Sequence, residues 1–204
     1  GFCVISDRHD TLIPTGAMRW GEMLKTTFAK YAPARIPVPG VASLSSALRT
    51  GADGVDYNPF FYVSSSPWNL YDLLLELLDI PLIPVGPLML RDIGLSRTEL
   101  ISGDHEAHKL EQIRKILKVY SSLQFMLIGD SGQEDPEIYL KVVKEFPGRI
   151  LMVFIRDIHD SRHEFVKVKQ AEMNLLGVEM LLIKDTEEAR NYSISKGWIT
   201  TSES

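Results

Sequence analysis

The feature that most constrains the fold of this chain is the alternation of short apolar runs with segments of helical spacing. Runs rich in β-branched and aromatic residues predict buried strands at Phe2–Ser6, Phe60–Ser64, Phe125–Gly129, Ile150–Ile155 and Met180–Ile183. Apolar residues with helical periodicity predict helices at Leu70–Leu78, Lys109–Tyr120, Glu137–Phe146 and Glu164–Leu176. Elements in this order predict an α/β fold, in which helices cover both faces of a parallel sheet.

The length and composition of the chain fit one domain built in three layers. With 204 residues, of which 45% are apolar, the chain can bury one full core. We predict a single Rossmann-like domain over residues 1–204, with a small cap formed by inserts at about 14–58 and 81–104. The first insert also contains a helix candidate at Ser43–Leu48. Because the chain opens directly on an apolar strand, we expect further sequence upstream of it.

Charge and cysteine content limit the classes of partner and compartment. The formal net charge of −5 gives no general attraction to nucleic acids or anionic lipids, so we expect no nucleic-acid partner. Cys3 is the single cysteine, which favours a reducing compartment and a cytoplasmic location. The longest apolar runs, Leu73–Leu78 and Ile80–Pro87, are interrupted by a charge or by prolines and are too short to span a membrane.

Polar residues follow the predicted strands at the points where those strands end. The first strand leads into Ser6–Thr11, the second into Ser64–Ser66, and the third into Gly129–Asp135. In open parallel sheets ligands bind beyond the carboxyl ends of the strands, so these segments converge on one edge. Acidic residues gathered there would repel one another without a cation, and their hard oxygen ligands favour Mg²⁺. We therefore predict a magnesium site formed by Asp7, Asp130 and Asp135.

The same residues suggest phosphoryl transfer. A carboxylate can attack phosphorus and form an aspartyl-phosphate, and Asp7 is the first acid after the first strand. Hydroxyls after the second strand, on Ser64 and Ser65, and the ammonium group of Lys109 would bind phosphate oxygens. Each residue also has a plainer interpretation alone, as a turn former, a helix cap or a solvated lysine. The ordered set of acid, hydroxyl, lysine and paired acids favours the catalytic interpretation.

This order of residues resembles that of the haloacid dehalogenase superfamily. Its four motifs are an Asp-x-Asp-x-Thr loop, a Ser or Thr, a Lys, and a Gly-Asp-x-x-x-x-Asp loop, and Gly129–Asp135 matches the last of these. The strings Phe61–Tyr71, His108-Lys109 and Gly129–Tyr139 further resemble the catalytic domain of actin-patch-type phosphatidate phosphatases. The resemblance implies Mg²⁺-dependent hydrolysis of phosphatidate, or of another phosphomonoester, with Asp7 as nucleophile.

One position departs from the family pattern. Where the family has its second Asp, the general acid that protonates the leaving alcohol, this chain has His9, and Asp10 stands one position along. We place His9 among the predicted catalytic and metal-site residues. Three hypotheses remain open: His9 acts as acid and base, the enzyme turns over slowly, or the chain is a phospholipid-binding module without turnover. A simple turn residue at position 9 is the plainer alternative.

Several other residues leave alternatives open. His105 and His108 have too few companions to predict a metal site and suit a helix start at the surface. His159 and His163 are placed at the carboxyl edge of the sheet, after the predicted strand Ile150–Ile155. Arg156, after the fourth strand, is either an additional phosphate contact or a salt-bridge partner of Asp157 or Asp160. Three aromatic residues suit either a peripheral membrane contact or the core: Trp20, Phe60 and Trp68. A phosphotransferase that passes the phosphate to an acceptor other than water is a third functional alternative.

Overall fold

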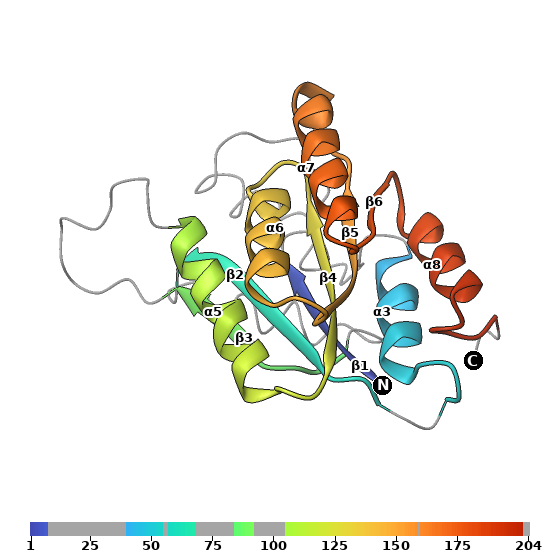
Figure 1. Cartoon of the computed structure of the whole chain (residues 1–204). Coiled ribbons are helices and arrows are strands. Elements are labelled where there is room, and N and C mark those ends of the chain that lie inside the picture. Colours follow the sequence, from blue (N-terminus) through green and yellow to red (C-terminus); the bar gives the residue numbers. More distant parts are fainter. Residues whose placement is uncertain (8–39, 55–56, 68–83, 92–104, 159, 202–204) are drawn as a thin grey trace, which may run out of the picture.

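The strands of the computed structural model form one parallel sheet. The structure describes residues 1–7, 40–54, 57–67, 84–91, 105–158 and 160–201. Within these residues the sheet has six strands in the order β3-β2-β1-β4-β5-β6, all parallel (Figure 1). Their bounds are β1 Phe2–Asp7, β2 Phe60–Pro67, β3 Leu88–Arg91, β4 Gln124–Asp130, β5 Ile150–Arg156 and β6 Met180–Ile183.

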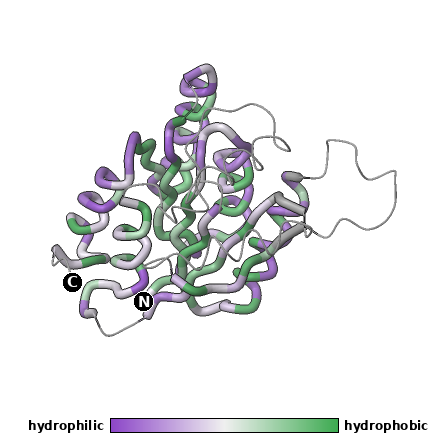
Figure 2. The backbone as a smooth tube through the Cα atoms, turned by 180° about the vertical axis from the view of Figure 1, so that it is seen from behind, coloured by the Kyte–Doolittle hydropathy of each residue, from purple (hydrophilic) through white to green (hydrophobic). Residues whose placement is uncertain are grey.

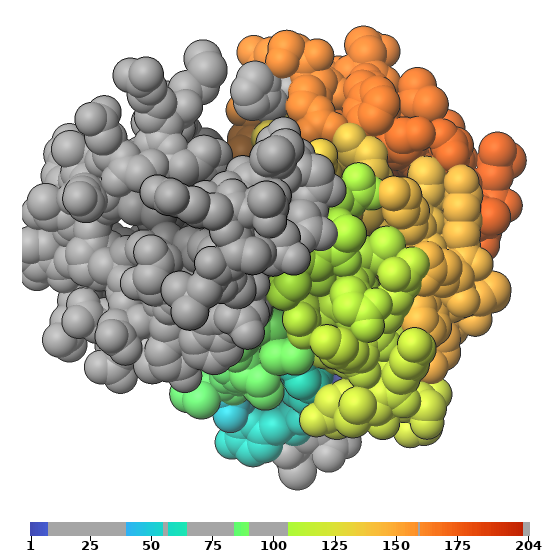
Figure 3. Space-filling model, turned by 90° about the vertical axis from the view of Figure 1, so that its left-hand side faces the viewer, coloured from blue at the N-terminus to red at the C-terminus, as the bar shows by residue number. Residues whose placement is uncertain are grey.

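Helices cover both faces of this sheet. One layer contains α5 His105–Val119, α6 Asp135–Glu145 and α7 His163–Leu175, which lie side by side in Figure 3. The other layer contains α3 Val41–Thr50 and α8 Thr186–Ser195, and a short 3₁₀ turn, η2 Asp160–Arg162, precedes α7. Each layer encloses its own apolar cluster against the sheet. The predicted three-layer α/β fold is therefore confirmed.

The two clusters follow from the alternation of side chains along each strand. In β1, Cys3 and Ile5 pack under the α5–α7 layer, while Val4 packs under α3 and α8. Strands buried on both faces need continuous apolar runs, which is the pattern seen in the sequence and in the hydrophobic centre of Figure 2. Cys3 is 0% exposed, and this burial raises the pKa of its thiol to about 11.

The strand order places a topological switch point between β1 and β4. From β1 the chain adds β2 and β3 on one side, and then returns to add β4, β5 and β6 on the other. Connections leave this point in opposite directions, which opens a crevice beyond the carboxyl ends of the two strands. β1 ends at Asp7 and β4 ends at Asp130, so both predicted acidic residues lie at this position.

Some elements differ from the predictions. The edge strand β3 lies in the range 81–104, where we expected only an insert, and it pairs with β2. Helix α3 lies in the expected insert 14–58 and packs on the sheet, so this part of the insert belongs to the core layer. Neither β3 nor α8 was predicted, because β3 follows prolines at 81, 84 and 87 and α8 is mostly polar. The cap, and the predicted helix Leu70–Leu78, lie outside the described residues.

The structure describes one of the three aromatic residues that we considered as possible membrane contacts, Phe60. Phe60 is 3% exposed and belongs to the cluster under α3 and α8, so the core alternative is correct for this residue. Trp20 and Trp68 lie outside the described residues. None of the helices that the structure describes is long and apolar enough to cross a membrane.

Candidate active site

Three acidic side chains meet at the switch point. Asp7 comes from the end of β1, Asp130 from the end of β4, and Asp135 from the first residue of α6. One carboxylate oxygen of each lies within 4.8 Å of the others. All three side chains are almost completely buried, at 0%, 2% and 0% exposure. The sheet and the start of α6 thus bring together the acids that the sequence predicted to converge.

Lys109 reaches the same cluster from the first turns of α5. Its side chain is only 1% exposed, which excludes the solvated alternative considered from the sequence. Nζ lies 2.9 Å from Asp7 Oδ2 and also donates to Asp135 Oδ1. Burial alone would lower the pKa of the ammonium group, but the charges of Asp135 and Asp7 outweigh it and raise that pKa above its ordinary value. Lys109 is therefore a permanent cation held between two carboxylates.

Asp130, at the end of β4, holds the loop that follows this strand through hydrogen bonds to its backbone. Asp130 Oδ1 accepts hydrogen bonds from the backbone N–H groups of Gly132 at 2.7 Å and Gln133 at 2.9 Å, which closes a tight turn. The N–H of Asp130 donates to Asp135 Oδ2 at 3.1 Å. A Cβ at Gly129 would lie 2.4 Å from that same oxygen, so position 129 needs a residue without a side chain. The spacing of the Gly-Asp and Asp residues follows from this geometry.

The charges of the cluster suit a divalent cation. Three carboxylates and one ammonium group leave a formal charge of −2 in a site with almost no solvent contact. Burial, followed by the charge of Asp7, raises the pKa of the Asp130 carboxyl. Burial also raises the pKa of the Asp135 carboxyl, against the opposing effect of Lys109. A divalent ion with a preference for oxygen ligands would remove this excess negative charge.

Contacts from β5 and η2 hold the loop after β4 in place. The Ser131 N–H donates to the carbonyl of Arg156 at 2.9 Å, and Ser131 Oγ accepts from the Ile158 N–H at 2.9 Å. Arg162, at the end of η2, donates to the carbonyl of Gln133 and to Glu137. Sequence reasoning missed these supports, because each joins segments that no motif links.

The other candidate residues take separate positions. Ser64 is buried near the end of β2, one residue beyond Val63, which is in register with Asp7 on β1. His9 and the side chain of Ser65 lie outside the described part of the chain. His108 contacts Gln112 one turn further along α5, as expected for a helix residue.

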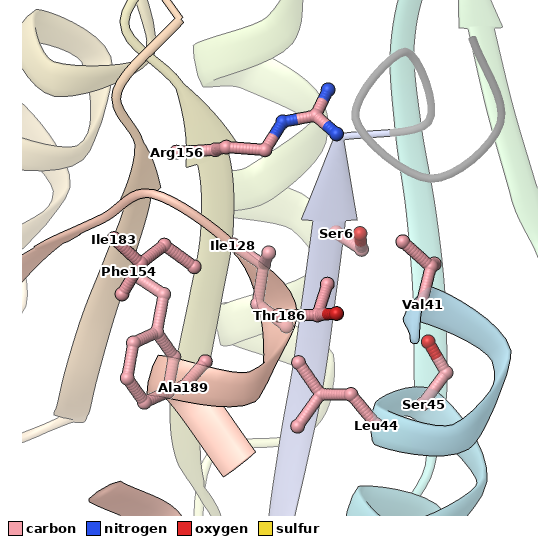
Figure 4. Close-up of a pocket in the computed structure, with 10 residues that line it drawn as sticks. All are labelled: Ser6, Val41, Leu44, Ser45, Ile128, Phe154, Arg156, Ile183, Thr186 and Ala189. Carbon is pink, nitrogen blue, oxygen red and sulfur yellow. The ribbon is translucent and has the colours of Figure 1, made fainter. Parts of the chain in front are cut away.

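The end of β5 and the segment after it contain Arg156, Asp157 and two of the candidate histidines. Asp157 pairs with His163 and accepts from Ser131 Oγ at 3.3 Å, so it is part of the loop support. The side chain of Arg156 extends across β4 toward the carboxyl end of β1 (Figure 4). His159 lies outside the described residues.

Comparisons with known proteins point to one family. Residues 2–157 match the family described as "Phosphatidate phosphatase APP1, catalytic domain". The chain is 31% identical over 177 residues to the phosphatidate phosphatase APP1 of Saccharomyces cerevisiae, which covers 85% of this chain and 29% of the yeast protein. It is 28% identical over 116 residues to an uncharacterized protein of Schizosaccharomyces pombe, covering 56% of this chain and 19% of that protein. No solved structure matches the chain.

The family match and the acidic cluster fall in the same part of the chain. The matched segment contains every residue of the acidic cluster together with Lys109, and it ends just after β5. The chain spans less than a third of the length of either curated relative. This chain belongs to the family of APP1 phosphatidate phosphatase catalytic domains.

Proposed function

We propose that this chain is a Mg²⁺-dependent phosphatidate phosphatase domain that works through an aspartyl-phosphate on Asp7. The observation that carries the proposal is the buried cluster of three carboxylates around Lys109, at the switch point of a domain from this family. A resident Mg²⁺ would be held by Asp7 and Asp130, and it would supply a Lewis acid for the phosphoryl oxygens. Asp135 would instead orient the site, because its two oxygens bind Lys109 and the Asp130 N–H.

The first step needs an ionised, correctly placed Asp7. Lys109 contacts Asp7 Oδ2 at 2.9 Å, which favours the carboxylate over the neutral acid and fixes its orientation. A carboxylate oxygen of Asp7 then attacks phosphorus, and the bond from phosphorus to the ester oxygen breaks. Ser64, with Ser65, would donate hydrogen bonds to the phosphoryl oxygens from the adjacent strand β2. The leaving diacylglycerol oxygen takes a proton from the residue at position 9.

The second step releases phosphate. Water attacks the phosphorus of the aspartyl-phosphate, its proton goes to the same residue at position 9, and the carboxylate of Asp7 is restored. We propose that His9 performs both transfers, since an imidazole gives up and accepts protons near neutral pH. The competing function is a phosphatidate-binding module without turnover, which the substitution of the family's acid by His9 favours.

The direct test is release of inorganic phosphate from short-chain phosphatidate and from a soluble phosphomonoester. We expect release with Mg²⁺ and its loss on addition of EDTA, because the cluster alone carries an excess negative charge that repels a phosphate dianion. Faster release from the lipid than from the soluble ester would assign the substrate class. Equal release with and without EDTA would contradict the metal-dependent mechanism.

Variants at position 9 separate the enzyme from the binding module. If His9 transfers protons, His9→Ala lowers turnover by about 10²- to 10⁴-fold, while His9→Asp keeps activity with an optimum at lower pH. The measurement is the pH profile of phosphate release for the parent chain and both variants. A parent chain that binds phosphatidate but releases no phosphate, with activity in His9→Asp alone, would instead establish the binding module.

A further inference from the structure

A pocket opens on the face of the sheet that α3 and α8 cover. Figure 4 shows its floor on β1, β4 and β5, between the first turns of the two helices. The lining is mostly apolar, with the hydroxyl groups of Ser6, Ser45 and Thr186 among it. Arg156 also lines the pocket, and its guanidinium group lies at the end nearest the carboxyl edge of the sheet. Ser6 lines the pocket and directly precedes Asp7, so the pocket adjoins the candidate active site on the α3 and α8 face of the sheet.

The position of Arg156 is fixed by the sheet. It is the last residue of β5 and is in register with Asp130, the last residue of β4. Alternation along β5 directs Val153 and Ile155 toward the α5–α7 layer, and Phe154 and therefore Arg156 toward α3 and α8. The carbonyl of Arg156 accepts from the Ser131 N–H, which ties its backbone to the loop after Asp130. Lys109 and Arg156 thus approach the acidic cluster from opposite faces of the sheet, Lys109 at Asp7 and Asp135 and Arg156 beside Asp130.

The two cations have different environments. Lys109 is buried and contacts both Asp7 and Asp135, so its charge is already used to compensate these acids. Arg156 is half-buried beside a pocket. Its charge is close enough to Asp130 to oppose, in part, the rise that burial causes in the pKa of that carboxyl. A planar guanidinium group offers two parallel N–H donors that match two oxygens of one phosphate, whereas an ammonium group has no such fixed pair of donors.

We propose that Arg156 is a substrate-binding residue that contacts the phosphate group of the phosphomonoester from the α3 and α8 side. This inference rests on the proposed function and adds a specificity determinant to it. The guanidinium group would place positive charge at the phosphate from this face of the sheet, while Lys109 contacts Asp7 and Asp135 from the other. It would favour a phosphomonoester, whose terminal phosphate is a dianion with a third non-bridging oxygen, over a phosphodiester, which carries a single negative charge.

The test compares Arg156→Gln and Arg156→Lys with the control Arg190→Gln. Arg190 lies on α8, on the same face of the molecule, and donates to Ser43 Oγ at 2.7 Å outside the pocket lining. For each protein we would measure KM and kcat with short-chain phosphatidate, the Kd for inorganic phosphate in the presence of Mg²⁺ by calorimetry, and the Tm. The phosphate titration needs no turnover, so it reports on binding separately from catalysis.

We expect Arg156→Gln to raise KM and the phosphate Kd by about 10- to 100-fold, the range for loss of a charge-assisted contact, with a much smaller change in kcat. Arg156→Lys should lie between this variant and the parent, since it keeps the charge and loses the fork. Unchanged KM and Kd in Arg156→Gln, or equal effects in Arg190→Gln, would overturn the inference.

Two further outcomes are also decisive. If Arg156→Gln does not fold, Arg156→Lys decides, because a parent-like phosphate Kd in that folded variant would overturn the bidentate contact. A parent chain that neither releases nor binds phosphate would overturn the proposed function together with this inference. A parent that releases phosphate, with no effect of either Arg156 variant, would overturn the inference alone.

Discussion

Replacing Asp7 by asparagine should reduce phosphate release by at least about a thousandfold while the protein stays folded. An amide of the same shape cannot attack phosphorus, and loss of a catalytic nucleophile typically costs several orders of magnitude. The fold should tolerate the change, because Asp7 is one of three buried acids whose negative charges repel one another in the folded protein, and asparagine removes one of these charges. We would measure multiple turnover, the Tm, and acid-stable labelling of the protein after a quenched reaction with ³²P-labelled phosphatidate.

The labelling experiment distinguishes the nucleophile from a residue that only supports the site. The parent chain should retain label that is stable in acid and is released by alkali, and Asp7→Asn should retain none. Asp53→Asn is the matched control, since Asp53 is an exposed acid just after α3. Label on Asp7→Asn, or turnover above about a tenth of the parent's, would remove Asp7 from the mechanism and direct attention to the other carboxylates.

Replacing Lys109 by methionine should reduce both stability and activity. The ammonium group is completely buried between Asp7 and Asp135, and its removal leaves two carboxylates without a cation. Breaking a buried pair from one side costs about 3–5 kcal/mol. For a domain of this size that loss lowers the Tm by roughly 10 °C. Phosphate release should fall as well, because Asp7 loses the contact that keeps it ionised and oriented.

A second substitution separates charge from shape. Lys109→Met combined with Asp135→Asn removes one of the stranded negative charges, so part of the lost Tm should return while activity stays low. Lys115→Met, at an exposed position on the same helix, serves as the control for loss of a lysine. A Lys109→Met protein with the parent's Tm would show that the two contacts of Lys109, with Asp7 and with Asp135, do not exist in solution.

The layers of the fold could be read from the sequence because parallel strands are buried on both faces. Phe125–Gly129 and Ile150–Ile155 are almost entirely apolar, and such runs, separated by helical patterns, leave few alternatives. Two elements gave no such signal. Strand β3 follows three prolines within seven residues and ends in an arginine, and α8 buries only two of its ten residues, so neither shows a clear period.

The acids of the site could also be anticipated, whereas their contacts could not. Asp7 and Asp130 end their strands, and strand ends converge in any parallel sheet. The sequence does not tell whether Asp135 holds a cation or braces Lys109, because that depends on the rotation of α6 at its first residue. Arg162 is 29 residues from Gln133 in the chain, with α6 and β5 between them, so it carries no local sign that it supports the loop.

The single thiol of this sequence offers a built-in probe of unfolding. Cys3 lies in β1, one of the two central strands of the sheet, where its side chain is fully buried. The raised pKa of its thiol keeps it in the unreactive protonated form. A thiol reagent should therefore modify the protein only when the strands β1, β2 and β4 separate, which amounts to opening the whole core. The rate of modification would report how often the native state opens, and any cysteine introduced on the surface could be labelled selectively without removing the natural one.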